Sequence, residues 1–371
     1  MMQAREAAGH PSEFPFFDAH LDLAYLAEVG RDLHATTDDC RGRYIPASVT
    51  LPAMADAGVT HCLGTIFTEA IFDYTAPDAE TGAFAYPAGD ALAAWKAGQR
   101  QLKLYQAWRD AGVIRLLPKR GDSAHETVGS GEATGSTPPL TLGILIECAD
   151  PIEKPEQMEE WAQAGVVAVG MAWWHQGRYA SGNGVTPGSK GDGLTPEGFE
   201  LIKEIDRLGV VHDLSHLSQR SSDQLLEATG ATVIASHSNS RAMMPGLEEQ
   251  AAQRHLNDET IREICARGGV IGLNLFSSFL HPGASGTKRA SIDDAVRHIE
   301  HVCEIAGSRA HTALGSDADG GFAANRLPEG LDRLTDLRKI TDALSARGWS
   351  DDEVRGFAFN NWARFWGMPT V

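Results

Sequence analysis

Residues 16–22 read FFDAHLD, a short apolar run that ends in a histidine and an aspartate. Seven similar apolar runs follow, and a loop or an amphipathic helical pattern separates each from the next. Most are apolar on both faces, which is typical of strands buried in a parallel sheet. The eight runs are 16–22, 59–67, 141–147, 166–173, 210–216, 232–237, 270–276 and 312–317.

Three helical patterns between the runs carry start and stop signals. Thr195 followed by Pro196 predicts the start of a helix, and Gly209 predicts its end. Asn257 and Ser291 are expected to cap two further helices. The face of the first helix that we expect to be buried comprises Phe199, Ile202, Ile205 and Leu208.

Eight strands interleaved with helices predict an α/β fold, a (β/α)8 TIM barrel, for which about 250 residues are typical. The chain has 371 residues, and loop insertions at 68–90 and 119–139 account for part of the excess. We expect a flexible N-terminal tail over 1–15 and a single catalytic barrel domain over 16–371. A doubly wound open sheet is the alternative, but no Gly-rich phosphate fingerprint follows the first strand.

The net charge narrows the classes of partner. Fifty acidic against 32 basic residues give a net charge of −18. This charge argues against binding nucleic acid through its phosphates and against docking on an anionic membrane. No apolar run approaches the roughly 18 residues of a membrane span. The expected partner is therefore a small molecule, and a homodimer is left open.

The cysteines and the start of the chain bear on the compartment. The first residues, MMQAREAAGHPSEF, lack the charged-then-apolar pattern of a secretory signal. The cysteines are odd in number and scattered, without a C-x-x-C motif, which favours a reducing cytoplasm over a disulfide framework. We therefore expect a cytoplasmic protein. The five cysteines are Cys40, Cys62, Cys148, Cys265 and Cys303.

Side chains that can bind metal stand at the ends of five predicted strands. In a barrel these ends meet at one mouth, where active sites lie. Imidazole and carboxylate suit zinc, and residues i and i+2 of a strand point to the same side. Two cations about 3.5–4 Å apart can share a water and turn it into hydroxide near neutral pH. The candidates are His20, Asp22, Glu147, His216, His237 and Asp317.

Other reactive residues receive plainer interpretations. His298 and His301 flank an apolar stripe without the H-E-x-x-H order, so we interpret them as surface or rim residues. Cys148 lacks a paired histidine and asparagine, so we expect no nucleophilic role for it. His216 alone could also cap the following helix.

Eight short segments, several of which contain the candidate residues, follow one another along the chain. They are DAHLD (18–22), GILIE (143–147), VVHDLSHLS (210–218), ASHSNSRAM (235–243), QRHLND (253–258), GGVIGLNLF (268–276), LGSDADG (314–320) and NNWARFW (360–366). In this order they resemble the motifs of the renal (membrane) dipeptidase family of binuclear zinc peptidases, a branch of the amidohydrolase barrels. The resemblance runs from about Phe16 to Phe365.

The resemblance implies a role for each residue. Asp317 would accept a proton from the bridging water and pass it to the leaving amine. Arg254 would hold the free α-carboxylate of the substrate, a task suited to its bidentate fork. The implied zinc ligands are His20 and Asp22 for one ion, His216 and His237 for the other, and Glu147 as the bridge.

Two departures from the family pattern stand near the site. Cys148 follows Glu147 where the family typically has Gly-Gly-His. One strand ends in Trp173 where well-known members have a histidine that polarises the substrate. His175 is the alternative candidate for that task.

The resemblance predicts a metal-dependent hydrolase, a dipeptidase in which a hydroxide bridges two zinc ions. Expected substrates are dipeptides, including L,D-dipeptides, or N-acyl amino acids. A binuclear-metal hydrolase of a lactone, hydantoin or other cyclic amide is the alternative, and independence from Arg254 would favour it. A catalytically silent small-molecule-binding relative is a further alternative, against which the retention of Asp317 argues.

Overall fold

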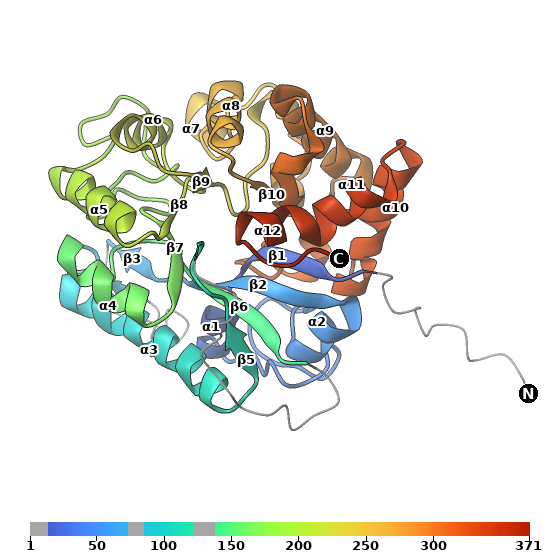
Figure 1. The fold of residues 1–371 in the computed structure, drawn as a ribbon, viewed down its shortest axis with the longest axis horizontal. Helices are drawn as coiled ribbons and strands as arrows, with labels where there is room; N and C mark the ends of the chain where they lie inside the picture. Colours follow the sequence, from blue (N-terminus) through green and yellow to red (C-terminus); the bar gives the residue numbers. More distant parts are fainter. Residues whose placement is uncertain (1–13, 73–84, 122–137) are drawn as a thin grey trace, which may run out of the picture.

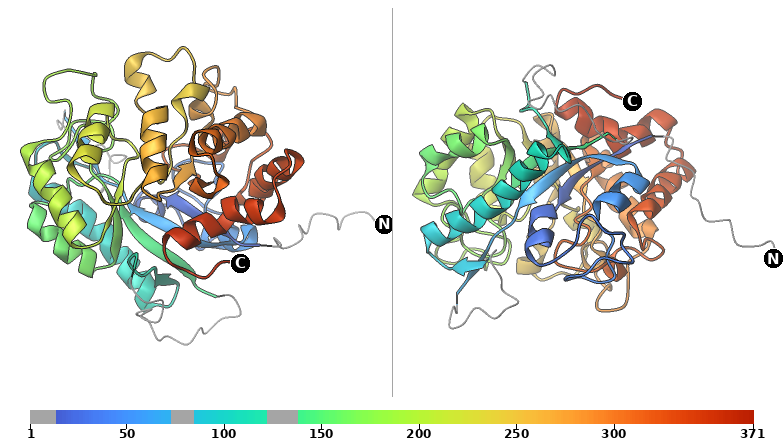
Figure 2. Two further views of the ribbon diagram at one scale, coloured as in Figure 1. Left: turned by 45° about the horizontal axis from the view of Figure 1, so that its top comes forward. Right: turned by 90° about the horizontal axis from the view of Figure 1, so that it is seen from below.

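The computed structural model describes residues 14–72, 85–121 and 138–371. Eight parallel strands form a barrel with helices around it (Figure 1), and Figure 2 shows the same arrangement from two other directions. The strand order is β10–β11–β1–β2–β6–β7–β8–β9, and a parallel bridge between Ala235 and Ile271 joins the two ends. The predicted (β/α)8 barrel is confirmed.

Each predicted strand overlaps one barrel strand, but the strands of the structure end one to three residues earlier than predicted. The chain turns away from the neighbouring strand at these points. The barrel strands are β1 (Phe16–Leu21), β2 (Val59–Ile66), β6 (Leu140–Ile146), β7 (Val166–Gly170), β8 (Val211–Asp213), β9 (Val233–Ile234), β10 (Ile271–Leu273) and β11 (Thr312–Leu314).

Twelve α-helices lie in the described residues, and the three predicted caps are confirmed. The side chains of Thr195, Asn257 and Ser291 each accept a hydrogen bond from a backbone N–H three residues later. The helices are α1 (Leu23–Glu28), α2 (Leu51–Ala57), α3 (Ala91–Asp110), α4 (Met158–Gln163), α5 (Pro196–Arg207), α6 (Gln219–Ala228), α7 (Glu249–Ala252), α8 (Asp258–Ala266), α9 (Ile292–Ala306), α10 (Arg338–Ala346), α11 (Asp351–Arg355) and α12 (Asn361–Phe365).

The predicted buried face of α5 is partly wrong. Phe199 is 37% exposed, whereas Leu201 is fully buried beside Ile202 and Ile205. An α-helix has 3.6 residues per turn, so residues spaced by three rotate gradually around the helix. The first and last residues of such a series therefore lie outside the buried face.

The predicted tail and insertions are only partly described. Residues 1–13, 73–84 and 122–137 lie outside the described residues. Around one of these gaps, β3 (Glu69–Ile71) and β4 (Ala85–Pro87) pair as a small parallel sheet. A further strand, β5 (Ile114–Leu116), pairs with β6 outside the barrel order. No described helix is both long and apolar enough to cross a membrane.

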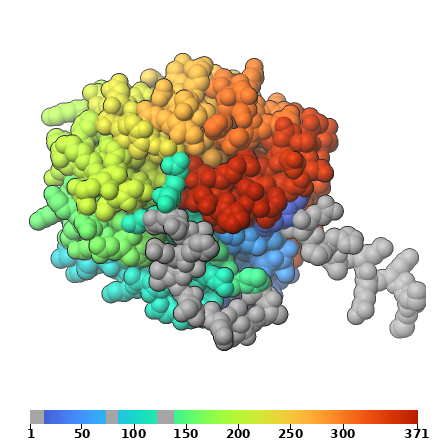
Figure 3. Space-filling model, viewed as in Figure 1, coloured from blue at the N-terminus to red at the C-terminus, as the bar shows by residue number. Residues whose placement is uncertain are grey.

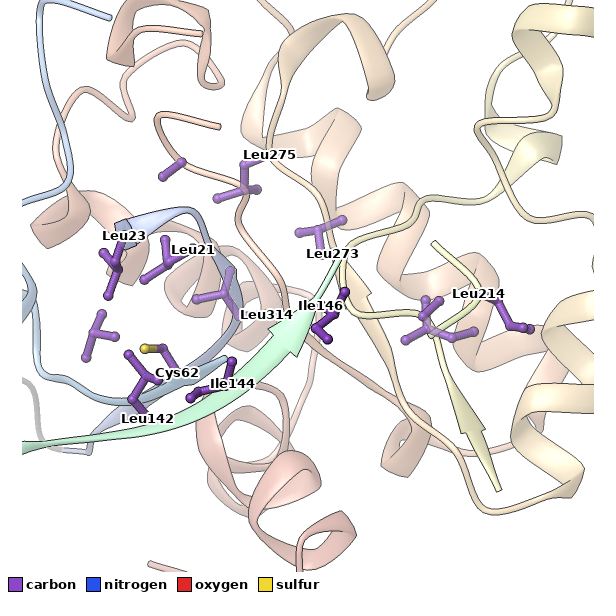
Figure 4. Close-up of a cluster of buried hydrophobic side chains, with 14 of the residues drawn as sticks. Leu21, Leu23, Cys62, Leu142, Ile144, Ile146, Leu214, Leu273, Leu275 and Leu314 are labelled. Atoms are coloured by element: carbon purple, nitrogen blue, oxygen red, sulfur yellow. The ribbon is translucent and has the colours of Figure 1, made fainter. Parts of the chain in front are cut away.

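Most of the barrel strands are buried on both faces, as predicted, and the exceptions lie near the starts of β2 and β6. The outward face packs under the helices, and Figure 4 shows part of this layer. Its labelled residues are Leu21, Leu23, Cys62, Leu142, Ile144, Ile146, Leu214, Leu273, Leu275 and Leu314. Apolar side chains from the inward face form a second cluster inside the barrel, which includes Phe17, Leu63, Leu145, Val167, Val211 and Ile234.

The C-terminal segment closes the end of the barrel at which the strands begin. A π-helical turn (Gly356–Asn360) leads into α12, and Phe359 of the turn joins the inner cluster together with Trp362 and Phe365 of α12. Trp362 Nε1 donates a hydrogen bond to Leu314 O at 2.8 Å. In Figure 3 the C-terminal residues, in red, cover the face on which Figure 1 shows α12. The other end of the barrel, where the strands finish, is left for the site.

Candidate metal centre

The six predicted metal-competent residues meet at the C-terminal ends of the strands. His20 is the penultimate residue of β1, the other five follow the last residue of their strands by one to three positions, and all six are buried. Three groups have ligand atoms within 4.8 Å of one another: His20, Asp22 and Glu147; Glu147, His216 and His237; and His20, His237 and Asp317. The groups share members, so they form one continuous cluster.

Glu147 is the centre of this cluster. Its Oε1 lies 3.5 Å from His20 Nε2, 3.4 Å from His216 Nε2 and 3.7 Å from His237 Nε2. Its Oε2 is buried without a hydrogen-bond partner. Asp22 Oδ1 lies 3.7 Å from His20 Nε2 on the other side. A carboxylate with three imidazole nitrogens around one oxygen has the position of a bridging ligand.

The Nδ1 atoms of the three histidines are held by side chains that the sequence analysis did not select. His237 Nδ1 and His20 Nδ1 lie 2.8 and 3.2 Å from Ser236 Oγ. That hydroxyl donates to Asp213 Oδ2 at 2.5 Å, so it can only accept from the two rings. His216 Nδ1 lies 2.9 Å from Asn183 Oδ1, which also accepts. All three rings therefore carry their proton on Nδ1.

This tautomer leaves every Nε2 as a lone pair aimed into the cluster. His20 Nε2 has no hydrogen-bond partner, and the Nε2 atoms of His216 and His237 face each other at 2.9 Å. Two lone pairs repel at this distance unless a positive charge lies nearby. Histidine ligands whose second nitrogen is held in this way are typical of metal sites. The cluster therefore fits divalent cations.

The pKa shifts point the same way. Burial raises the pKa of Asp22 to about 6 and those of Glu147 and Asp317 to about 8. Burial also lowers the pKa values of His216 and His237 well below the usual range. Burial alone favours neutral carboxyls, whereas a bound cation favours carboxylates and neutral imidazoles. Three buried carboxyls without an adequate positive partner indicate a site built for cations.

Two residues of the cluster adopt left-handed backbone conformations. His216 has φ 68° and Asp317 has φ 56°, values that are uncommon for residues other than glycine. Strain of this kind persists where the surrounding structure holds it, and it gathers at functional sites. It directs both side chains inward from the turns that follow their strands.

A cavity of about 350 Å³ opens over the cluster. Aromatic residues make up half of its lining; Trp173, for example, packs edge-on against Phe67 at 5.1 Å between ring centroids. Two larger hollows in the described residues contain none of the six clustered residues. The cavity is lined by Asp22, Tyr25, Tyr44, Phe67, Glu69, Glu147, Trp173, His216, Phe276, Phe279, Asp317, Gly320, Gly321 and Phe322.

Arg254 lies behind this wall rather than in it. It is 4% exposed, and its guanidinium lies 5.0 Å from the Phe279 ring centroid. Nη2 donates to His237 O at 2.9 Å and Nη1 to Ser238 Oγ at 3.1 Å, while Nε has no partner. Its role as a carboxylate clamp stays a prediction.

Trp173 and His175, the residues near the position where the resemblance implies a substrate-polarising group, lie in different surroundings. Trp173 lines the cavity, with its ring centroid 5.9 Å from that of His216. His175 is exposed, contacts the Phe72 ring, and does not line the cavity. Burial raises the pKa of the Cys148 thiol, which fits the expectation of an unreactive cysteine.

The interpretation of His298 as a surface residue is wrong. His298 is 1% exposed; its Nδ1 accepts from Ser240 N and its Nε2 donates to Leu280 O, both at 3.1 Å. The buried face of α9 therefore includes polar residues such as His298 beside its apolar ones. His301 is partly buried and lies 2.9 Å from Asp258 Oδ1.

The sequence is similar to that of known peptidases. A profile of the family described as Membrane dipeptidase (Peptidase family M19) matches residues 5–369. A Klebsiella pneumoniae protein named "Uncharacterized protein in pqqA 5'region" is 32% identical over 210 residues, 56% of this chain and 73% of that protein. An uncharacterized dipeptidase of Schizosaccharomyces pombe is 33% identical over 186 residues, which cover 49% of this chain but only 41% of that relative.

Solved structures share the fold. Dipeptidase AC, a metallopeptidase of family M19, superposes with a TM-score of 0.71 at 25% identity, covering 95% of this chain and 99% of that one. A Rhodobacter sphaeroides metallopeptidase gives 0.72 at 23% identity with the same coverage, and its crystal held a phosphinate mimic of L-Ala-D-Ala. With a family match over nearly its whole length, the chain belongs to the membrane dipeptidase family, peptidase family M19, and is a metallopeptidase on an amidohydrolase-like barrel.

Proposed function

We propose that the protein hydrolyses the amide bond of a dipeptide or a small N-acyl amino acid with the help of two zinc ions. The convergence of three histidine Nε2 atoms on Glu147 Oε1 carries this proposal. Imidazole and carboxylate donors suit zinc. Two divalent cations about 3.5–4 Å apart polarise a carbonyl and lower the pKa of a shared water.

The ligands divide into two halves around the bridge. His20 and Asp22 come from the end of β1 and would hold one ion, with the Asp22 carboxylate oriented by the hydroxyl of Thr65. His216 and His237, from the ends of β8 and β9, would hold the other. Because these side chains come from separate strands of a packed barrel, their spacing is set before any ligand arrives.

Asp317 is the proposed proton carrier. It is the member of the cluster that adjoins His20 and His237, and it also lines the cavity. Its carboxylate would take a proton from the attacking water and give it to the nitrogen of the leaving amine as the amide bond breaks. Proton transfer by a positioned carboxylate contributes typically 10²–10⁴-fold to the rate.

The wall of the cavity favours apolar substrate side chains. Seven of its lining residues are aromatic: Tyr25, Tyr44, Phe67, Trp173, Phe276, Phe279 and Phe322. The phosphinate mimic of L-Ala-D-Ala in the Rhodobacter sphaeroides relative supports a dipeptide substrate, including one with a D-residue at its C-terminal position.

One observation favours the alternative substrate class. No arginine or lysine of the described chain lines the cavity, because Arg254 lies behind Phe279. The predicted clamp would need Arg254 to be uncovered, whereas a cyclic amide or lactone has no free carboxylate and needs no clamp. A hydrolase of such cyclic substrates therefore stays the second candidate.

A substrate screen with zinc-loaded protein separates the two. We expect hydrolysis of apolar L,L- or L,D-dipeptides and weaker hydrolysis of their C-terminal amides. Chelation should abolish the activity and zinc should restore it. Hydrolysis of hydantoins or lactones without hydrolysis of dipeptides would replace the proposal with the alternative.

We also propose a cytoplasmic location. All five cysteines are free in the described part of the chain, and four of them are buried. Free thiols are typical of reducing compartments. Fractionation of the producing cells tests this, and recovery outside the cytoplasm would contradict it.

A further inference from the structure

Asn274 stands directly behind Asp317, outside the wall of the cavity. It follows β10, is fully buried, and donates a hydrogen bond from Nδ2 to Asp317 Oδ2 at 2.9 Å. Its Oδ1 accepts from Phe276 N at 2.7 Å. A backbone N–H can only donate, so the amide oxygen must face Phe276 and the amide nitrogen must face Asp317.

The backbone of Asn274 is fixed by a second asparagine. Asn274 N donates to Asn239 Oδ1, and Asn239 Nδ2 donates to Asn274 O, both at 3.0 Å. Asn239 Nδ2 also donates to Phe279 O at 3.0 Å. Asn274 is thus held through its backbone N–H and C=O and through both ends of its side-chain amide, so the amide has little freedom to turn.

Asp317 needs such a support. Its backbone is in the left-handed region, with φ 56°, which is costly for a residue other than glycine. Oδ1 lies so close to Gly320 that a Cβ there would be 1.8 Å away. Within the described ranges, no hydrogen bond to Oδ1 is found, although Oδ2 is held by Asn274.

We propose that Asn274 is a positioning residue for the hydrolysis. It binds Oδ2 of Asp317 and thereby leaves Oδ1 to face the reacting atoms in the cavity. This inference rests on the proposed function, in which Asp317 carries the proton. Asn274 does not line the cavity, so it acts through Asp317 and not on the substrate.

Two substitutions test the amide donor. Asn274→Asp, when ionised, keeps an acceptor for Phe276 N but removes the donor to Asp317, and Asn274→Ala removes both. Each should lower kcat by about 10-fold or more, the scale of a hydrogen bond to a charged group, with KM and metal content unchanged. Asn361→Ala is the matched control, because that buried asparagine bonds the backbone carbonyls of Arg309 and Thr312 at the closed end of the barrel. It should cost stability without lowering kcat.

A double-mutant cycle separates positioning from a general loss of structure. In an Asp317→Asn background, either substitution at Asn274 should have no further effect on kcat, because the group that it positions is gone. Full additivity of the two losses, or an unchanged kcat in both Asn274 variants, would overturn the inference.

A crystal structure of Asn274→Ala provides a readout that does not depend on turnover. The Asp317 carboxylate should leave its position or adopt a second rotamer. An Asp317 in its original position would overturn the inference. If the wild-type protein cleaves no dipeptide, the proposed function fails, whereas this structure still decides whether Asn274 positions Asp317.

Discussion

The two ends of the barrel are built from the same eight strands but differ in their chemistry. At the end where the strands begin, Phe359, Trp362, Phe365 and Trp366 close the barrel with buried rings. At the end where they finish, three carboxyls and three histidines are buried around a cavity. Burial of apolar rings stabilises the first end, whereas burial of ionisable groups at the second end costs stability and provides reactive side chains.

The backbone conformation also differs between the two ends of the barrel, with left-handed residues at the open end and a helical segment at the closed end. His216 and Asp317 have left-handed conformations at the open end. The segment that closes the other end is helical and hydrogen-bonded to the strands through Asn361 and Trp362. Stability and function are thus assigned to opposite ends of the strands, a division that is general among barrels of this type. Substitutions at the two ends should therefore separate loss of stability from loss of activity.

The largest effect is expected from Trp362→Ala at the closed end. Trp362 is fully buried, and truncation of such a side chain costs about 3–5 kcal/mol of unfolding free energy. The molecules that remain folded should keep kcat/KM, because the change is far from the cavity. Urea denaturation and kinetics on the same preparation check this, with Trp362→Phe as the milder variant. A loss of kcat/KM without a loss of stability would break the comparison.

The substitution Asp317→Asn at the open end should lower activity without lowering the free energy of unfolding. We expect kcat to fall by about 10²-fold or more, with the metal retained. Unfolding free energy should stay the same or rise, because asparagine tolerates the left-handed region and is neutral when buried. Near-full activity would remove Asp317 from the mechanism, and loss of the metals would make it a ligand instead.

Arg254→Met tests the predicted carboxylate clamp. A charge-assisted contact is worth about 1.5–3 kcal/mol, or roughly 10- to 150-fold in kcat/KM for free dipeptides, mostly through KM. The same change should hardly affect a C-terminally amidated dipeptide. If the wild-type enzyme cleaves free and amidated dipeptides equally well, Arg254 is not a clamp.

The substitution His61→Gln at the closed end is expected to change the free energy of unfolding least at neutral pH. The His61 ring lies 5.0 Å from Phe359, and burial lowers its pKa to about 4, against about 6.5 when unfolded. Between these values the unfolded chain binds the extra proton, so stability falls as the pH drops from about 6.5 to about 4. His61→Gln should lose less stability on this acidification than wild type. Equal losses in urea denaturation at pH 7 and 4.5 would contradict the assignment.

Much of the fold could be predicted because the signals are local. Short apolar runs and capping residues such as Thr195 can be recognised from the few residues around them. The strand ends could not be placed as well, because a ladder stops where the partner strand turns away. The burial of His298 is not visible in the sequence, because its partners, Ser240 and Leu280, are distant along the chain.

The site was predictable to a similar depth. The clustered residues stand at strand ends, and their order along the chain resembles one family. Ser236 and Asp213 lie in the same motifs, but spacing alone does not show that one hydroxyl joins two imidazoles. Asn183 comes from a loop without a comparable motif. The placement of Arg254 behind Phe279 depends on side-chain packing that no local pattern records.

Counting the metal ions tests the central claim most directly. Elemental analysis of protein purified without chelator should find close to two divalent ions per chain, and zinc should be the most abundant of them. Glu147→Gln should lower occupancy at both sites, because a neutral amide is a poor bridge between cations. Glu69→Gln, which changes a carboxylate of the same cavity outside the cluster, should keep both ions. Finding no metal, or a single ion that is unaffected by substitution of His216 and His237, would contradict the account.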